Sequence, residues 1–86
     1  MKLKQQLIRR EIAGENVLIP VGEMAQNHAG LFVLNELGAF IWDVLPQAED
    51  EDAVLQAVLA EYEVSAEEAK RDIHEFLAKL RQMDIL

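Results

Sequence analysis

The hydrophobic pattern of residues 31–45 changes its period at Asn35. Before Asn35 the chain has a short, continuous apolar run, which is typical of a buried strand. After Asn35, apolar residues recur every three or four positions, as on one face of a helix. This helical set is Leu37, Phe40, Ile41, Val44 and Leu45. Because asparagine is a favoured first-turn cap, we predict a strand over residues 31–34 and a helix over about residues 36–45.

Two further strands are predicted before this boundary, over residues 7–13 and 16–21. Glycine in the pair Gly14-Glu15 supplies the backbone freedom of a tight hairpin turn between them. The polar residues 22–30 then form a loop that leads into the third strand. The chain thus begins with three short strands, which we expect to pair as an antiparallel sheet.

Two more helices are predicted in the second half of the chain. Asp50 can cap a helix over about residues 51–62, and Ser65 and Glu68 have capping-box spacing at the start of a helix over about residues 66–82. Three strands followed by three helices make one α+β domain that spans all 86 residues. Its predicted topology is winged-helix-like, with a three-stranded antiparallel sheet followed by a three-helix bundle.

Length and composition limit the function that such a domain can have. A chain of 86 residues buries one modest core, which leaves little room for a walled active-site cavity. It has no cysteine, so a disulfide framework and a thiolate metal site are both excluded. We expect His28 in the polar loop and His74 on the surface, and neither has a partner at a catalytic spacing. We therefore predict a protein that is not an enzyme and that binds no cofactor or metal.

Charge and hydropathy narrow the choice of partners. The chain has 16 acidic and 8 basic residues, whereas binding to a phosphate backbone depends on an excess of Lys and Arg. No window approaches the roughly 18 to 20 consecutive apolar residues of a membrane span, and Arg9 and Arg10 precede any apolar signal region. We expect a soluble, cytoplasmic protein with no nucleic-acid or membrane partner. A winged-helix transcription regulator remains the alternative, since the topology is common among DNA-binding proteins.

Several segments occur in an order and spacing that resemble one known family. They are residues 10–15 and 17–20 of the hairpin, residues 34–42 at the strand-to-helix boundary, and Ala60, Glu61, Tyr62, Val64, Asp72, Ile73, Phe76, Leu77 and Leu80 in the last two helices. The family is that of PqqD, whose members are recognition elements for ribosomally made precursor peptides. The resemblance extends over roughly residues 5–86. Many relatives carry a glycine where this chain has Met83-Asp84, so we expect the last helix to end less cleanly.

The resemblance implies a non-catalytic adaptor. Members of the family bind the leader segment of a precursor peptide as an added strand, against the third strand and beside the last helix. They present the peptide to a radical-SAM enzyme or another maturation enzyme. A structural subunit that docks on an enzyme without contacting a peptide is a further alternative.

The site implied by this resemblance has one half on the third strand. The predicted strand residues are Leu31, Phe32, Val33 and Leu34. An extended peptide can gain main-chain hydrogen bonds at such a strand edge and specificity from alternate side chains. The sequence leaves open whether Phe32 and Leu34, or Leu31 and Val33, face the core.

The other half of the predicted site lies on the last helix. We expect Ala69 and Ile73 to line an apolar slot, with Lys70, Arg71 and Asp72 at its rim. In the preceding helix 36–45, Gly38 costs about 1 kcal/mol relative to alanine, so we expect another backbone to approach closely there.

Overall fold

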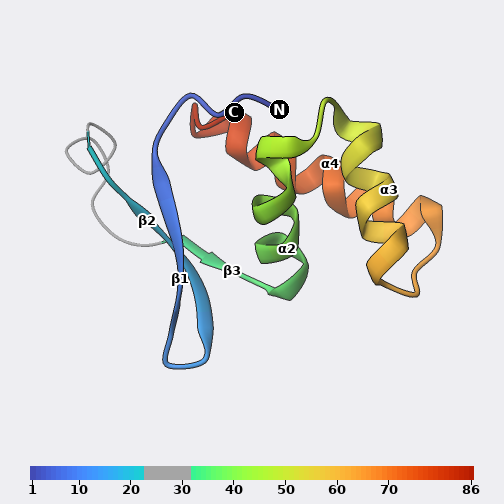
Figure 1. Cartoon of the computed structure of the whole chain (residues 1–86), viewed down its shortest axis with the longest axis horizontal. Helices are drawn as coiled ribbons and strands as arrows, with labels where there is room; N and C mark the ends of the chain where they lie inside the picture. Colours follow the sequence, from blue (N-terminus) through green and yellow to red (C-terminus); the bar gives the residue numbers. More distant parts are fainter. Residues whose placement is uncertain (23–31) are drawn as a thin grey trace.

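The computed structural model describes residues 1–22 and 32–86. In these residues it has a three-stranded antiparallel sheet followed by three α-helices, as the sequence predicts (Figure 1). The elements, labelled as in Figure 1, are β1 (Leu7–Ile12), β2 (Glu15–Pro20), β3 (Phe32–Leu34), α2 (Glu36–Val44), the 3₁₀ turn η1 (Leu45–Gln47), α3 (Glu51–Glu61) and α4 (Ala66–Gln82). The predictions for Leu31, His28 and the loop that contains His28 lie outside the described residues.

The sheet has β2 in the middle, β1 on one side and β3 on the other. Leu18 of β2 pairs with Arg9 of β1 and with Phe32 of β3. Leu18 is buried, and Phe32 and Leu34 pack against the same core, so these residues define the inner face. Val33 points the opposite way and is 63% exposed. Phe32 and Leu34 are therefore the pair that faces the core.

The hairpin between β1 and β2 turns one residue earlier than predicted. Ala13 and Gly14 both have positive φ angles, 53° and 81°, and β2 already begins at Glu15. Two consecutive positive values fit a type I′ turn, whose twist matches that of two paired strands. Gly14 signals this turn in the sequence, whereas Ala13 does not, because its Cβ disfavours the left-handed conformation.

Each α-helix in the described residues begins at a side-chain cap that the sequence predicts. The capping bonds run from Gly38 N to Asn35 Oδ1 (2.7 Å), from Ala53 N to Asp50 Oδ1 (2.9 Å) and from Glu68 N to Ser65 Oγ (3.1 Å). The backbone N–H groups of the first helical turn have no carbonyl acceptor within the helix, and each of these bonds satisfies one of them. Contacts over three residues thus fix where each helix starts.

The end of α4 is closed without a glycine. The helix ends at Gln82, as predicted, and Asp84 adopts the left-handed conformation with φ 58°. The backbone N–H of Ile85 then donates to the carbonyl oxygen of Leu80 at 2.9 Å. Ile85 is fully buried, so this turn carries the chain back onto the core. The expected ragged end is replaced by a defined cap, in which Asp84 takes the strained position.

A bidentate ion pair between Arg9 and Asp43 connects the sheet to α2. Arg9 Nε donates to Asp43 Oδ1 at 2.8 Å and Arg9 Nη2 donates to Asp43 Oδ2 at 2.7 Å, while Nη1 donates to Asn16 Oδ1 at 2.9 Å. The hydrogen bonds that Arg9 donates to the Asp43 carboxylate raise the pKa of Arg9 above its usual value. The planar fork of arginine suits this paired geometry. Arg9 therefore links β1, β2 and α2 in one contact.

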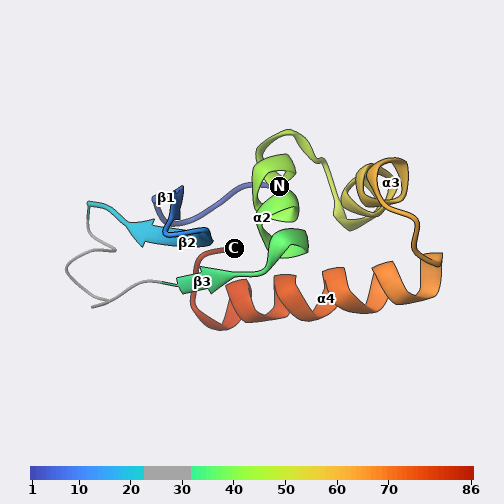
Figure 2. The ribbon, with the colours of Figure 1, turned by 90° about the horizontal axis from the view of Figure 1, so that it is seen from below.

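The core lies between the inner face of the sheet and the helices. Its most fully buried members come from the sheet, the three helices, η1 and the C-terminal residues: Leu18, Ile41, Leu45, Val54, Val58, Ile73, Leu77 and Ile85. Figure 2 shows α4 running along one side of the molecule, with its first half next to α3 and its second half next to β3. The two ends of α4 thus have different neighbours.

None of the helices in residues 1–22 and 32–86 is long and apolar enough to cross a membrane.

Candidate functional site

A groove lies between β3 and the second half of α4. It has a volume of about 400 Å³ and is lined by Leu18, Phe32, Val33, Leu34, Asn35, Phe76, Lys79, Leu80, Met83 and Ile85. Buried Leu18, Leu80 and Ile85 belong to the core beneath it, while Phe76 and Met83 are half-buried. We call this hollow the β3–α4 groove. It is an apolar channel beside the edge strand of the sheet.

A smaller hollow of about 210 Å³ continues the groove towards the start of α2. The two hollows share Asn35, Phe76 and Lys79 in their linings. The smaller one adds the acidic side chains of Asp72 and Glu75. The groove is therefore apolar along β3 and becomes acidic at its α2 end, with Lys79 where the two parts meet.

Gly38 determines how closely α2 approaches the wall of the groove. A Cβ atom at Gly38 would lie 3.1 Å from Asn35 Oδ1, 3.3 Å from Phe76 Cε1 and 3.6 Å from Leu34 Cβ. The first two distances are shorter than an ordinary van der Waals contact. The close approach predicted at Gly38 thus exists, but it involves the side chains of Phe76 and Asn35 rather than another backbone. Glycine lets the Phe76 ring stand between α2 and the groove.

The strand half of the predicted site lies in this groove. Phe32, Val33 and Leu34 all line it, and β3 has only β2 as a neighbouring strand in the described part of the sheet. Leu31 is outside the described residues. Asp72 is the one member of the predicted helix half that lies nearby, in the smaller hollow.

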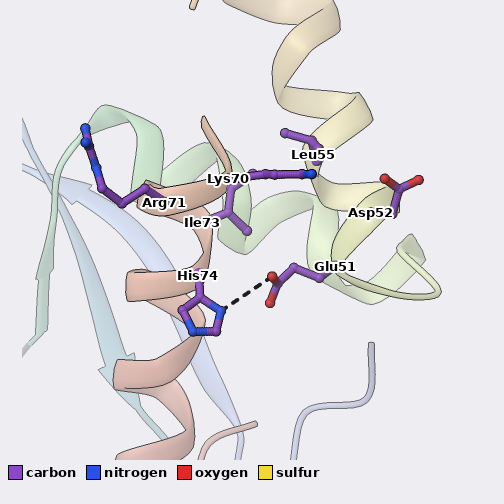
Figure 3. Close-up of a pocket in the computed structure, with 7 residues that line it drawn as sticks. All are labelled: Glu51, Asp52, Leu55, Lys70, Arg71, Ile73 and His74. Carbon is purple, nitrogen blue, oxygen red and sulfur yellow. Dashed lines mark ion pairs between the residues drawn. The ribbon is translucent and has the colours of Figure 1, made fainter. Parts of the chain in front are cut away.

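The other predicted helix residues lie away from β3. Ala69 and Ile73 are only 2% and 0% exposed and form part of the core, and neither lines the β3–α4 groove, although Ile73 does line the hollow between α3 and α4. Lys70 and Arg71 line a separate hollow of about 490 Å³ between α3 and α4, where they are joined by His74 (Figure 3). The structure therefore does not bring these residues together with the strand. Any contact of Lys70 or Arg71 with a peptide stays a prediction.

Figure 3 shows how the charged residues of this second hollow are arranged. Lys70 extends towards Leu55 of α3, whereas Arg71 points away from α3. His74 Nδ1 lies 3.6 Å from Glu51 Oε2, and His74 is largely exposed, as expected, whereas Glu51 is half-buried. The hollow shares no lining residue with the β3–α4 groove. It is a surface depression over the helix pair, separate from the sheet edge, and it is lined by apolar Leu55 and Ile73 as well as by charged side chains.

Besides Leu18, Asn35 and Ile85, the groove residues that the sequence did not reveal are on α4 and at its C-terminal cap, one to three turns beyond the predicted segment. Phe76, Lys79, Leu80 and Met83 follow one another at spacings of three, one and three residues, so they share one helix face. Ala69, Ile73, Phe76, Leu77 and Leu80 form an apolar stripe along this helix in the sequence. Met83 continues the stripe by one turn, and this added apolar residue is the sequence signal for the far end of the groove.

The residues of this site suit the recognition of a ligand by its shape and by main-chain hydrogen bonds. In residues 1–22 and 32–86, no group of three or more His, Cys, Asp or Glu side chains could hold a metal ion. The groove itself holds mainly apolar side chains and the ammonium group of Lys79. Such a channel next to a strand edge suits an extended peptide segment.

Comparison with known proteins identifies the family. A family model described as coenzyme PQQ synthesis protein D (PqqD) matches residues 16–86. The chain belongs to the PqqD family. This confirms the resemblance seen in its sequence. No curated protein matches the chain.

Two solved structures resemble this PqqD family member over nearly its whole length. One is TbiB1 in complex with the TbiA(beta) leader peptide, with a TM-score of 0.74 and 27% identity over 100% of this chain and 94% of that chain. The other is lasso peptide synthetase B1 complexed with the leader peptide, with a TM-score of 0.72 and 23% identity over 98% of this chain and 93% of that chain. Because the second structure is only 23% identical to this chain, the likeness to it is one of fold alone.

Proposed function

We propose that this protein binds the leader segment of a ribosomally made precursor peptide as an extra strand beside β3, in the β3–α4 groove. The observation that carries the proposal is an apolar groove between the edge strand β3 and α4, lined by Phe32, Leu34, Phe76 and Met83. Membership of the PqqD family and the likeness to TbiB1, which holds a leader peptide, support it.

The binding mode follows from the geometry of a strand. β3 is three residues long, which corresponds to about 10 Å of extended chain. A peptide beside it gains main-chain hydrogen bonds, and every second side chain of the peptide points into the groove. Burying one large apolar side chain there contributes about 1.5–3 kcal/mol. One or two such anchors, with the backbone pairing, account for recognition of a short segment.

The protein acts in this proposal as an adaptor and not as a catalyst. It holds the leader segment, while a separate enzyme, of the radical-SAM or another maturation type, modifies the rest of the precursor. Because precursor peptides are made on ribosomes, we place the complex in the cytoplasm. Asp72 lies at the α2 end of the groove, where it faces one end of the bound segment.

NMR titration of the labelled protein with the N-terminal segment of the precursor encoded beside its gene tests the proposal. We expect amide shifts concentrated in Phe32–Leu34 of β3 and in residues 76–83 of α4. Shifts confined to residues 69–74 and α3 would contradict the groove and would favour the charged hollow of Figure 3. Absence of binding to any leader, with binding to the enzyme retained, would favour a structural subunit.

Methylation of single amides in the peptide tests strand addition itself. In a strand, only alternate N–H groups point towards the neighbouring strand. We therefore expect every second methylated amide to weaken binding and the amides between them to have little effect. A uniform effect along the peptide would argue against strand pairing. Duplex DNA serves as the control ligand, since its affinity would fall steeply with salt whereas leader affinity would not.

A further inference from the structure

Lys79 stands apart from the other charged residues of α4. It lines both parts of the β3–α4 groove and is exposed. The ion pairs within residues 1–22 and 32–86 involve Lys4, Arg9, Arg71 and His74, but not Lys79. Its ammonium group is therefore available to a ligand in the groove.

The surroundings of Lys79 give the groove an electrostatic direction. Towards Met83 its neighbours in the lining are apolar, and towards α2 they are the acidic Asp72 and Glu75. Asp72 already has Arg71 Nε at 3.8 Å, whereas no ion pair within the described residues involves Glu75. A peptide carboxylate beside Lys79 is attracted on the Met83 side and repelled further towards α2.

We propose that Lys79 selects leader peptides with an acidic residue within two positions of the apolar anchor that enters the groove. This inference rests on the proposed function and adds the chemical class of its ligand. Side chains two positions apart on a strand point to the same side and are about 7 Å apart. An anchor over Leu18 and Leu80 and a carboxylate at Lys79 fit this spacing, because all three residues line one hollow. The partially apolar surroundings strengthen the pairing relative to that of a fully hydrated ion pair.

Charge reversal with a matched control tests the inference. Lys79→Glu is compared with Arg81→Glu, which makes the same change in net charge two residues away on the same helix. Both are basic residues in the last turn of α4, so both variants lose the same favourable interaction with the helix dipole. Arg81 is exposed and does not line the groove, since two residues turn the helix by about 200°.

The probe is the N-terminal segment of the neighbouring precursor, together with variants in which each Asp or Glu is changed to Lys, one at a time. We expect Lys79→Glu to weaken binding of the native segment about three- to ten-fold and Arg81→Glu to change it less than about two-fold. One acidic-to-Lys peptide should bind Lys79→Glu better than the native peptide does. That reversal of preference is the decisive result, because a general loss of folding cannot produce it.

Two results would overturn the inference and leave the proposed function standing. One is binding in the groove with equal effects of Lys79→Glu and Arg81→Glu. The other is a leader that binds in the groove without any acidic residue near its anchor. If the native segment produces no shifts in Phe32–Leu34 or residues 76–83, the proposed function itself fails. Thermal midpoints of both variants establish that they are equally folded.

Discussion

The two halves of α4 carry one continuous apolar stripe but lie in different surroundings. Ala69 and Ile73 in the first half are almost completely buried in the core, where α4 packs against α3. Phe76 in the second half and Met83 just after the last residue of the helix are half-buried and line the groove beside β3. A whole helix lies opposite the first half, whereas a strand of three residues lies opposite the second. Leu77 and Leu80 stay in the core in the second half, so the neighbouring element decides only whether the edge of the stripe is covered or, as at Phe76, half-exposed in the groove.

Truncation in the first half should affect folding. We expect Ile73→Ala to lower the free energy of unfolding by about 2–5 kcal/mol, because Ile73 is fully buried and the change leaves a cavity. Urea denaturation measures this. The milder Ile73→Val should cost about 0.5–1.5 kcal/mol and leave a folded protein with unchanged leader affinity. A loss of leader affinity in Ile73→Val without a loss of stability would bring this half of the helix back into the site.

Truncation in the second half should affect binding more than folding. Phe76 is half-buried, so we expect Phe76→Ala to cost about 1–3 kcal/mol of stability, less than full burial would imply. Leader affinity should fall at least about ten-fold, because the variant removes a wall of the groove. Isothermal titration calorimetry measures the affinity. Phe76→Leu, which keeps an apolar wall, should lose much less, and an equal loss in both variants would mean that the ring is not a contact.

Local contacts explain why much of the fold could be predicted from the sequence. The caps at Asn35, Asp50 and Ser65 each act over three residues, so the sequence itself contains the signal for where the helices begin. The hairpin turn was placed one residue too late, because Ala13 accepts a conformation that its own side chain disfavours. Tertiary pairing of β1 with β2 overrides this local preference.

The candidate site could be predicted only in part, for a related reason. The apolar run before Asn35 identifies β3 as a strand, and its place at the sheet edge follows from the topology. Ile73 and Leu80 occupy equivalent positions in the helical pattern, about two turns apart. Which of these turns lies beside β3 depends on how α4 is offset along the sheet, and no local pattern encodes that offset. The predicted helix half was therefore placed on the turns that face α3.

Gly38 of α2 lies next to Phe76, the first residue of α4 that lines the β3–α4 groove. Alanine there gains about 1 kcal/mol in helix propensity but crowds the Phe76 ring at 3.3 Å and Asn35 Oδ1 at 3.1 Å. Overpacking costs about 1–3 kcal/mol, so we expect Gly38→Ala to lower stability by about 1 kcal/mol and to weaken leader binding. Urea denaturation and calorimetry measure the two effects.

The double variant Gly38→Ala, Phe76→Leu separates crowding from other causes. If the ring is the obstacle, the smaller leucine should recover part of the stability that Gly38→Ala loses. An increase in stability in Gly38→Ala alone would contradict the prediction. It would mean that Phe76 moves aside freely and that Gly38 does not fix the groove wall.

The smallest effect is expected at the C-terminal end of α4, where Asp84 holds the left-handed cap next to the groove. Glycine adopts this conformation without strain but loses more entropy on folding, so we expect Asp84→Gly to stabilise the protein by only about 0.5 kcal/mol. The ion pair of Asp84 with Lys4, at 3.3 Å, is largely exposed and contributes little. Thermal denaturation of Asp84→Gly and of Lys4→Ala separates the effect of backbone strain from that of the ion pair. A thermal midpoint lowered equally in both variants would show that loss of the ion pair outweighs the relief of backbone strain. Because the cap only returns Ile85 to the core beneath the groove, leader affinity should stay the same while the thermal midpoint rises.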